Sequence, residues 1–252
     1  MKVVRGGTVV ESHWAAAADI LIDDGRVVAV LAPGSEVDSS AEIVDATGKL
    51  VLPGGVDPHC HVGFTSGEFT SLDSYLECTT AAVFGGTTTI IDFAIPRPGQ
   101  QPLDAAEVQR AKASSGLCDS ALHACVVDWD ETTAEQLKTL SEAGIRTVKM
   151  FTTYAGETMA NEHTILNTMQ ATRDLGGMVV IHCESDAIVT RRAERRGGFG
   201  WRRCSAHVAD PSGARGNSLG SRDSRDRRIA GGTGVFCAPI DPGCSRTRRR
   251  RP

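Results

Sequence analysis

Residues 51–61 read VLPGGVDPHCH, and this segment decides how the rest of the chain is interpreted. An apolar run ends there in two histidines, His59 and His61, separated by one residue. Residues i and i+2 of a strand point to the same side, so both imidazoles would face one side of a strand end. Such a pair can bind one metal ion through ring nitrogens. The spacing alone leaves metal binding and an ordinary polar strand end equally open.

Five apolar, β-rich runs alternate with four helix-like stretches between residues 51 and 185. The joints are short and contain glycine, and the runs are mostly apolar, as in sheets that helices cover. This alternation predicts an α/β fold with a parallel sheet or barrel. The expected strands lie at 51–59, 86–95, 121–129, 146–154 and 177–185, and the expected helices at 71–85, 103–116, 132–144 and 163–177.

Residues 1–50 have a different pattern. Short runs alternate apolar and polar residues and are broken by glycine and aspartate. Asp-Asp-Gly at 23–25 lies between two such runs and indicates a β-hairpin. We therefore expect a small sheet layer before the first βα unit.

The net charge of −4 hides an asymmetry between two parts of the chain. Residues 1–190 carry 11 Lys and Arg against 26 Asp and Glu, which argues against a nucleic-acid partner for the main body. Residues 191–252 carry 16 Arg, no Lys and 5 Asp and Glu. We interpret this tail as a frameshifted translation of a GC-rich gene. The alternative is a natural basic, disordered tail that binds nucleic acid or acidic partners.

The cysteines and the hydropathy bear on location. Eight cysteines form no CxxC pair, and we expect them to be reduced thiols. No run of 18 apolar residues occurs, and the N-terminus reaches acidic and polar residues too soon for a signal peptide. We expect no membrane partner and a cytoplasmic location.

Two further residues stand at expected strand ends, Lys149 in the run 146–154 and His182 in the run 177–185. Barrel enzymes place their active sites at that end of the strands. Singly, Lys149 could be a snorkelling side chain and His182 a hydrogen-bonded core histidine. Together with His59 and His61 they favour a shared site, because a lysine in an apolar strand is costly unless its charge is paired or removed.

Four segments give a specific resemblance: PGGVDPHCH at 53–61, FGGTTTIIDFAIP at 84–96, VKMFTTY at 148–154 and VVIHCES at 179–185. In this order and spacing the chain resembles the dihydropyrimidinase/hydantoinase group of the amidohydrolase superfamily over about residues 1–190. The resemblance implies a (β/α)8 TIM-type barrel and a β-sandwich built from both chain ends. We accordingly divide the chain into a β-sandwich portion at 1–52, the first half of the barrel at 53–190 and the tail at 191–252.

The resemblance also implies a site with two zinc ions. His59 and His61 match the ligands of the first metal, Lys149 the carboxylated lysine that bridges both, and His182 a ligand of the second. Tyr154 matches the tyrosine whose hydroxyl stabilises the oxyanion. Asp57 matches an aspartate that supports the metal site from nearby.

The sequence departs from the family after the fifth strand. The family's general base, an aspartate at the end of the eighth strand, and a histidine at the end of the sixth have no matching segment. His207 lies in the tail without a strand before it and is not assigned. We therefore expect a barrel truncated after about five strands, prone to aggregation.

The implied activity is hydrolysis of the ring amide C–N bond of a dihydropyrimidine or hydantoin to an N-carbamoyl amino acid. An allantoinase is an alternative, although Tyr154 favours the hydantoinase side, and Gly63 stands where a dihydroorotase would have arginine. A non-catalytic scaffold of the same fold and an inactive truncated product are further hypotheses. The expected partners are a small cyclic ureide or imide and, as is common in the family, copies of the chain in a homotetramer.

Overall fold

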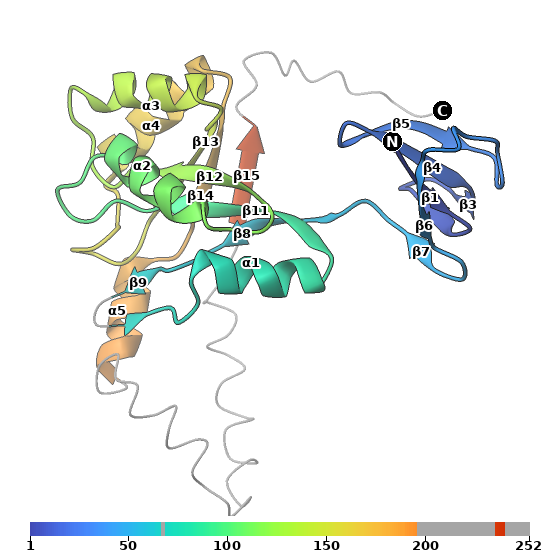
Figure 1. Ribbon diagram of the computed structural model, residues 1–252. Helices are drawn as coiled ribbons and strands as arrows, with labels where there is room; N and C mark the ends of the chain where they lie inside the picture. The colour runs from blue at the N-terminus through green and yellow to red at the C-terminus, as the bar shows by residue number, and fades with distance from the viewer. Residues whose placement is uncertain (67–68, 196–234, 240–252) are drawn as a thin grey trace, which may run out of the picture. The chain divides into compact units, whose positions relative to one another are not determined.

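The structure is a computed structural model that describes residues 1–66, 69–195 and 235–239 (Figure 1). The chain divides into two compact units. The first comprises Met1–Val56 with Gly86–Thr88, and the second Asp57–Gly85 with Thr89–Pro252. No helix in the described ranges is long and apolar enough to span a bilayer.

The first unit holds two small sheets, one with the order β5-β4-β1-β6 and the other with the order β3-β2-β7. Val9, Ala18 and Ile20 form a small apolar core with the partly buried Val4, Ile22 and Val51. The strands are β1 (Lys2–Arg5), β2 (Thr8–Val10), β3 (Ala15–Ala17), β4 (Asp19–Asp23), β5 (Arg26–Leu31), β6 (Glu42–Asp45) and β7 (Leu50–Val51).

The predicted hairpin at 23–25 is confirmed. Strands β4 and β5 pair antiparallel, with Asp23 opposite Arg26. The two residues between them, Asp24 and Gly25, have φ values of 45° and 71°. Positive φ at both central positions is the type I′ geometry, whose twist matches that of the flanking strands.

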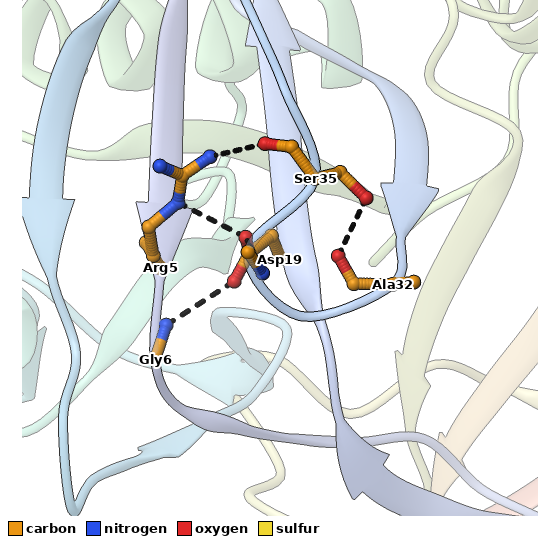
Figure 2. Close-up of polar contacts among 6 residues, drawn as sticks. Arg5, Gly6, Asp19, Ala32 and Ser35 are labelled. Carbon is orange, nitrogen blue, oxygen red and sulfur yellow. Dashed lines mark hydrogen bonds and ion pairs between the residues drawn. The ribbon is translucent and has the colours of Figure 1, made fainter.

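Asp19 anchors the first unit from a buried position. Its side chain is 1% exposed and accepts hydrogen bonds from the backbone N–H of Gly6 at 3.2 Å and of Gly34 at 3.0 Å. The Arg5 guanidinium donates at 3.0 Å and also reaches the carbonyl oxygen of Ser35 (Figure 2). Burial acts to raise the pKa of Asp19, but these hydrogen bonds and the Arg5 charge outweigh it and hold the pKa below its usual value.

The second unit is built on a six-stranded sheet with the order β15-β14-β13-β12-β11-β8. Strands β11, β12, β13 and β14 pair in parallel, each with the next along the chain. All five strands expected between residues 51 and 185 are present. They are β8 (Gly55–Cys60), β11 (Thr87–Ala94), β12 (Asp119–Cys125), β13 (Thr147–Phe151) and β14 (Met178–His182).

The four expected helices lie between these strands. They are α1 (Tyr75–Phe84), α2 (Pro102–Ala113), α3 (Thr133–Glu142) and α4 (Glu162–Asp174). Helix α1 begins with a capping box, in which Ser74 Oγ accepts from the Glu77 N–H and the Glu77 carboxylate accepts from the Ser74 N–H. Helices α2, α3 and α4 pack in sequence beside one another against the sheet (Figure 1).

The main apolar core lies between those helices and the sheet. It is made of alanine, valine, leucine, isoleucine and methionine side chains. Its buried members are Ala94, Ala105, Ala106, Leu122, Ala124, Val126, Leu137, Leu140, Ile145, Val148, Met150 and Val179. This packing fixes the strands whose carboxyl ends carry the residues singled out above.

Three elements were not expected. A short hairpin, β9 (Thr65–Ser66) and β10 (Phe69–Thr70), lies between β8 and α1. Helix α5 (Asp186–Arg195) follows β14. Its sequence contains Ala, Glu and Arg, which favour helices, and Asp186 in its first turn interacts favourably with the helix dipole. Strand β15 (Val235–Pro239) pairs antiparallel with β14.

A disordered tail was predicted for residues 191–252. The structure differs from that prediction at 191–195, the end of α5, and at 235–239, which form β15. The prediction was based on composition alone, which does not indicate that residues 235–239 pair with the edge strand β14. The rest of the tail, with His207, lies outside the described residues.

Candidate active site

The predicted site residues come from three strands and from the loop that follows one of them. His59 lies in β8 and His61 directly follows it, Lys149 lies in the middle of β13, and His182 is the last residue of β14. Tyr154 stands three residues beyond the end of β13. Since neighbouring parallel strands end at one edge of a sheet, the fold brings this set to one edge.

Phe93, from β11, contacts both histidines of the HxH pair. Its buried ring stacks on His61 with centroids 4.8 Å apart and lies 4.5 Å from the ring of His59. The two imidazoles are 5.5 Å apart, edge to face. The Phe93 ring therefore packs against both imidazoles, at the end of the sheet.

The surroundings lower the pKa of both histidines. The pKa of His59 is lowered by desolvation and then by the positive charge of Lys149. Desolvation also lowers the pKa of His61, against the opposing effect of the Asp92 carboxylate. A neutral imidazole is the form that binds a metal, so the surroundings favour the ligand state of both side chains.

Lys149 is 1% exposed. Its Nζ lies 5.1 Å from the ring centroid of Phe93 and 5.0 Å from that of Phe151, within cation–π range of both. Conversion of this amine to a carbamate would replace its positive charge with anionic oxygens. Lys149 thus joins the side of the site that holds His59 and His61 to the side that holds Phe151.

His182 and Tyr154 lie on that second side. The rings of Phe151, Tyr154 and His182 are neighbours, with centroids 5.6 Å apart for Tyr154 and His182. The His182 Nε2 is buried and has no hydrogen-bond partner in the described part of the chain, and the nearest carboxylate oxygen, on Glu184, is 3.5 Å away. Burial, and then the Glu184 charge, raise the pKa of the Tyr154 phenol.

Asp57 is exposed, and its carboxylate turns toward the backbone of His59, two residues later in the chain. The Oδ1 atom accepts a hydrogen bond of 3.0 Å from the N–H of His59. Its negative charge also acts to raise the pKa of His59. In this arrangement Asp57 fixes the backbone that carries the first histidine.

His123 was not singled out from the sequence. This buried side chain in β12 lies 4.7 Å from the Phe93 ring, and its Nε2 is 2.9 Å from the carbonyl oxygen of Pro58, next to His59. Its Nδ1 contacts the hydroxyl of Thr147. Desolvation lowers the pKa of His123 and outweighs the effect of Pro58. A histidine in the apolar run 121–129 was the available signal.

Asp92, in β11, is a further buried acidic residue that contacts the HxH segment. It is 1% exposed and accepts hydrogen bonds from the Tyr75 hydroxyl at 2.5 Å, the Gln109 side chain at 2.6 Å and the Phe93 N–H at 2.6 Å. The N–H of Val62, the residue after His61, lies 3.4 Å from both carboxylate oxygens. The cluster therefore ties the end of the HxH segment to β11.

The donor set fits a metal site in its chemistry. It offers neutral imidazoles at His59 and His61, a buried amine at Lys149 and an unsatisfied buried nitrogen on His182. In the described ranges, no three His, Cys, Asp or Glu side chains converge closely enough to hold an ion by themselves. Lysine is outside that set, and Lys149 would add oxygen donors only as a carbamate, because a protonated amine has no lone pair to offer.

The sequence profile of the amidohydrolase family matches residues 50–210, and the chain belongs to this family. Its relatives include the dihydropyrimidinase of Rattus norvegicus, 35% identical over 198 residues, which are 77% of this chain and 38% of the rat protein. The D-hydantoinase of Streptomyces coelicolor is 36% identical over 187 residues, 73% of this chain and 40% of that protein.

Solved structures agree with these relatives. A D-hydantoinase from Bacillus sp. AR9 superposes with a TM-score of 0.73 at 32% identity, covering 77% of this chain and 42% of its own. A dihydropyrimidinase from Brevibacillus agri superposes with a TM-score of 0.72 at 34% identity, over 78% of this chain and 43% of that protein. The chain thus spans about two-fifths of the length of these proteins. The resemblance and the fold class derived from the sequence are both confirmed.

Proposed function

We propose that this chain carries the metal-binding half of a cyclic-amide hydrolase site that opens the ring C–N bond of a dihydropyrimidine or hydantoin. The product would be an N-carbamoyl amino acid. The observation that carries the proposal is the arrangement of His59, His61, Lys149, Tyr154 and His182 at one edge of a parallel sheet in a chain related to dihydropyrimidinases and D-hydantoinases.

Two zinc ions are the proposed cofactor, with His59 and His61 holding one and His182 the other. Lys149 would serve both after its neutral amine adds carbon dioxide, which forms an N–C bond, releases a proton and leaves an anionic carbamate. When bound, zinc would supply Lewis acidity toward the ring carbonyl and lower the pKa of a bound water.

The chain's own residues would act on substrate orientation and charge. The Tyr154 phenol would donate a hydrogen bond to the ring carbonyl oxygen as negative charge builds there. Phe93 and Phe151 flank Lys149 and keep water from its amine. We leave the general base unassigned, because no described residue matches the family's aspartate.

The finer properties of the family are proposed with it. A small cyclic ureide or imide is the substrate class, the assembly is a homotetramer, and the location is the cytoplasm. Residues 191–252 are proposed to be a shifted reading of the gene, since they contain 16 Arg and no Lys.

Hydrolysis of dihydrouracil and of hydantoin tests the proposal. It is measured on the chain and on a version in which residues after 190 come from the adjacent reading frame. We expect activity in the frame-corrected version and its loss in that version with Tyr154→Phe. Absence of hydrolysis and of zinc in the corrected version would overturn the enzyme assignment.

A further inference from the structure

Tyr154 has an unusual backbone conformation. Its φ is 68°, and among the described non-glycine residues only Asp24, in the hairpin turn, shares a positive value. The left-handed region is disfavoured for bulky side chains, and such residues persist where the surroundings hold them. The contacts of the Tyr154 peptide groups show what holds this one.

Asp186 holds the N–H side. Its Oδ1 accepts hydrogen bonds from the N–H of Tyr154 at 3.0 Å, the N–H of Ala155 at 3.3 Å and the hydroxyl of Thr153 at 3.1 Å. Three successive residues of the loop therefore converge on one carboxylate oxygen. A charged acceptor makes stronger hydrogen bonds than a neutral one.

The carbonyl side is fixed by the loop itself. The Tyr154 carbonyl oxygen accepts from the N–H groups of Glu157 at 3.0 Å, Thr158 at 3.1 Å and Met159 at 3.3 Å. With both peptide groups held, the direction of the Cα–Cβ bond is set. The phenol ring then lies 5.6 Å from the His182 ring.

Asp186 stands at the start of α5 but does not cap that helix. The N–H groups of Ile188 and Val189 donate to the carbonyl oxygen of Ser185 instead. The remaining oxygen of Asp186 has a long contact of 3.5 Å with the Thr190 hydroxyl. The carboxylate is therefore directed toward the Tyr154 loop.

The same stretch of chain carries His182. Thr152 donates from its N–H to the His182 carbonyl oxygen at 3.0 Å and from its hydroxyl to the Glu184 carbonyl oxygen at 2.7 Å. Asp186 follows four residues after His182. The loops after β13 and β14 are thus joined by hydrogen bonds from Thr152 and by those to Asp186.

We propose that Asp186 is a positioning residue that holds Tyr154 in its left-handed conformation and so aims the phenol at the metal side of the site. This inference rests on the proposed function, because Tyr154 has a catalytic part only there. The positioning itself is a property of the described chain and can be measured without substrate.

The full chain has only two tyrosines, Tyr75 and Tyr154, so selective tyrosine labelling gives one reporter at the loop and one internal control in the same protein. NMR of ¹⁵N,¹³C-tyrosine protein yields the amide exchange rate, the Cα shift and the HN–Hα coupling of each. The variants are Asp186→Ala, the conservative Asp186→Asn, which keeps an acceptor oxygen, and Thr190→Val as a matched control on the same helix.

In Asp186→Ala we expect the Tyr154 amide to exchange roughly tenfold faster or more, as loss of a charge-assisted hydrogen bond implies. The Cα shift and coupling should leave left-handed values, with Tyr75 unchanged. Asp186→Asn should restore most of the Tyr154 signature, and Thr190→Val should retain it. Unchanged Tyr154 signals in Asp186→Ala, or equal changes at Tyr75, would overturn the inference.

Hydrolysis distinguishes this inference from the function beneath it. In an active frame-corrected chain, Asp186→Ala should lower kcat about as much as Tyr154→Phe, with a smaller change in KM. If no version hydrolyses a cyclic ureide, the proposed function fails, while the NMR result still decides whether Asp186 sets the Tyr154 backbone.

Discussion

Replacing Tyr75 with phenylalanine removes the hydroxyl that donates a hydrogen bond to the buried carboxylate of Asp92. Tyr75 is 3% exposed, and its hydroxyl donates this bond at 2.5 Å. Asp92 would keep its bonds from Gln109 and from the Phe93 N–H. Loss of the hydrogen bond to the buried carboxylate costs about 1.5–3 kcal/mol, and the longer bond that the hydroxyl accepts from Gln109 at 3.3 Å is lost with it. We expect the free energy of unfolding to fall by about that amount.

The assay is urea unfolding of the full chain, followed by circular dichroism, with Tyr154→Phe as the control. The chemical change is identical, but Tyr154 is 39% exposed and its hydroxyl has no hydrogen bond within the described residues, so the control should change stability by less than about 0.5 kcal/mol. Equal urea midpoints for the two variants would refute the account of the Asp92 cluster.

Further predictions concern charge and thiol burial. Asp19→Asn should cost about 1.5–3 kcal/mol, since it weakens the charge-assisted bond from Arg5 and those from two backbone N–H groups. The pKa of Asp19 in the folded state is lowered from 3.8, so its contribution to the free energy of unfolding is fully present above pH 3.8. That contribution is lost as the pH falls through the lower folded-state pKa. The free energies of unfolding of the two proteins, measured with urea from pH 6 to 2, should therefore converge. Cys183 is exposed, whereas burial raises the pKa of Cys125 to about 12, so iodoacetamide at pH 8 should modify Cys183 before Cys125, as peptide mass spectrometry would show. Modification of Cys125 at an equal rate in the folded chain would contradict its burial.

The elements that carry the site could be predicted because their signals are local. Lys149 and His182 each occur in or end an apolar run of strand length, and glycines mark the joints on either side. Parallel pairing then places the ends of those runs at one edge of a sheet without further information. The hairpin at Asp24 and Gly25 could likewise be predicted from a local signal, the Asp-Asp-Gly sequence between two β-like runs.

The supporting contacts could not be predicted, because they join residues far apart in sequence. His123 reaches the Pro58 carbonyl across 65 positions, and Asp186 reaches the Tyr154 N–H across 32. No periodicity encodes such a pairing. The left-handed conformation of Tyr154 follows from these contacts and from no property of tyrosine.

Zinc content tests the central claim most directly. The full chain is purified with zinc and bicarbonate, dialysed, and analysed by inductively coupled plasma mass spectrometry beside His61→Ala and the control His163→Ala, an exposed histidine on α4. We predict that the unmodified chain and His163→Ala retain zinc and that His61→Ala loses it. Zinc absent from all three proteins, or equal in all three, would contradict a metal site built on the HxH pair.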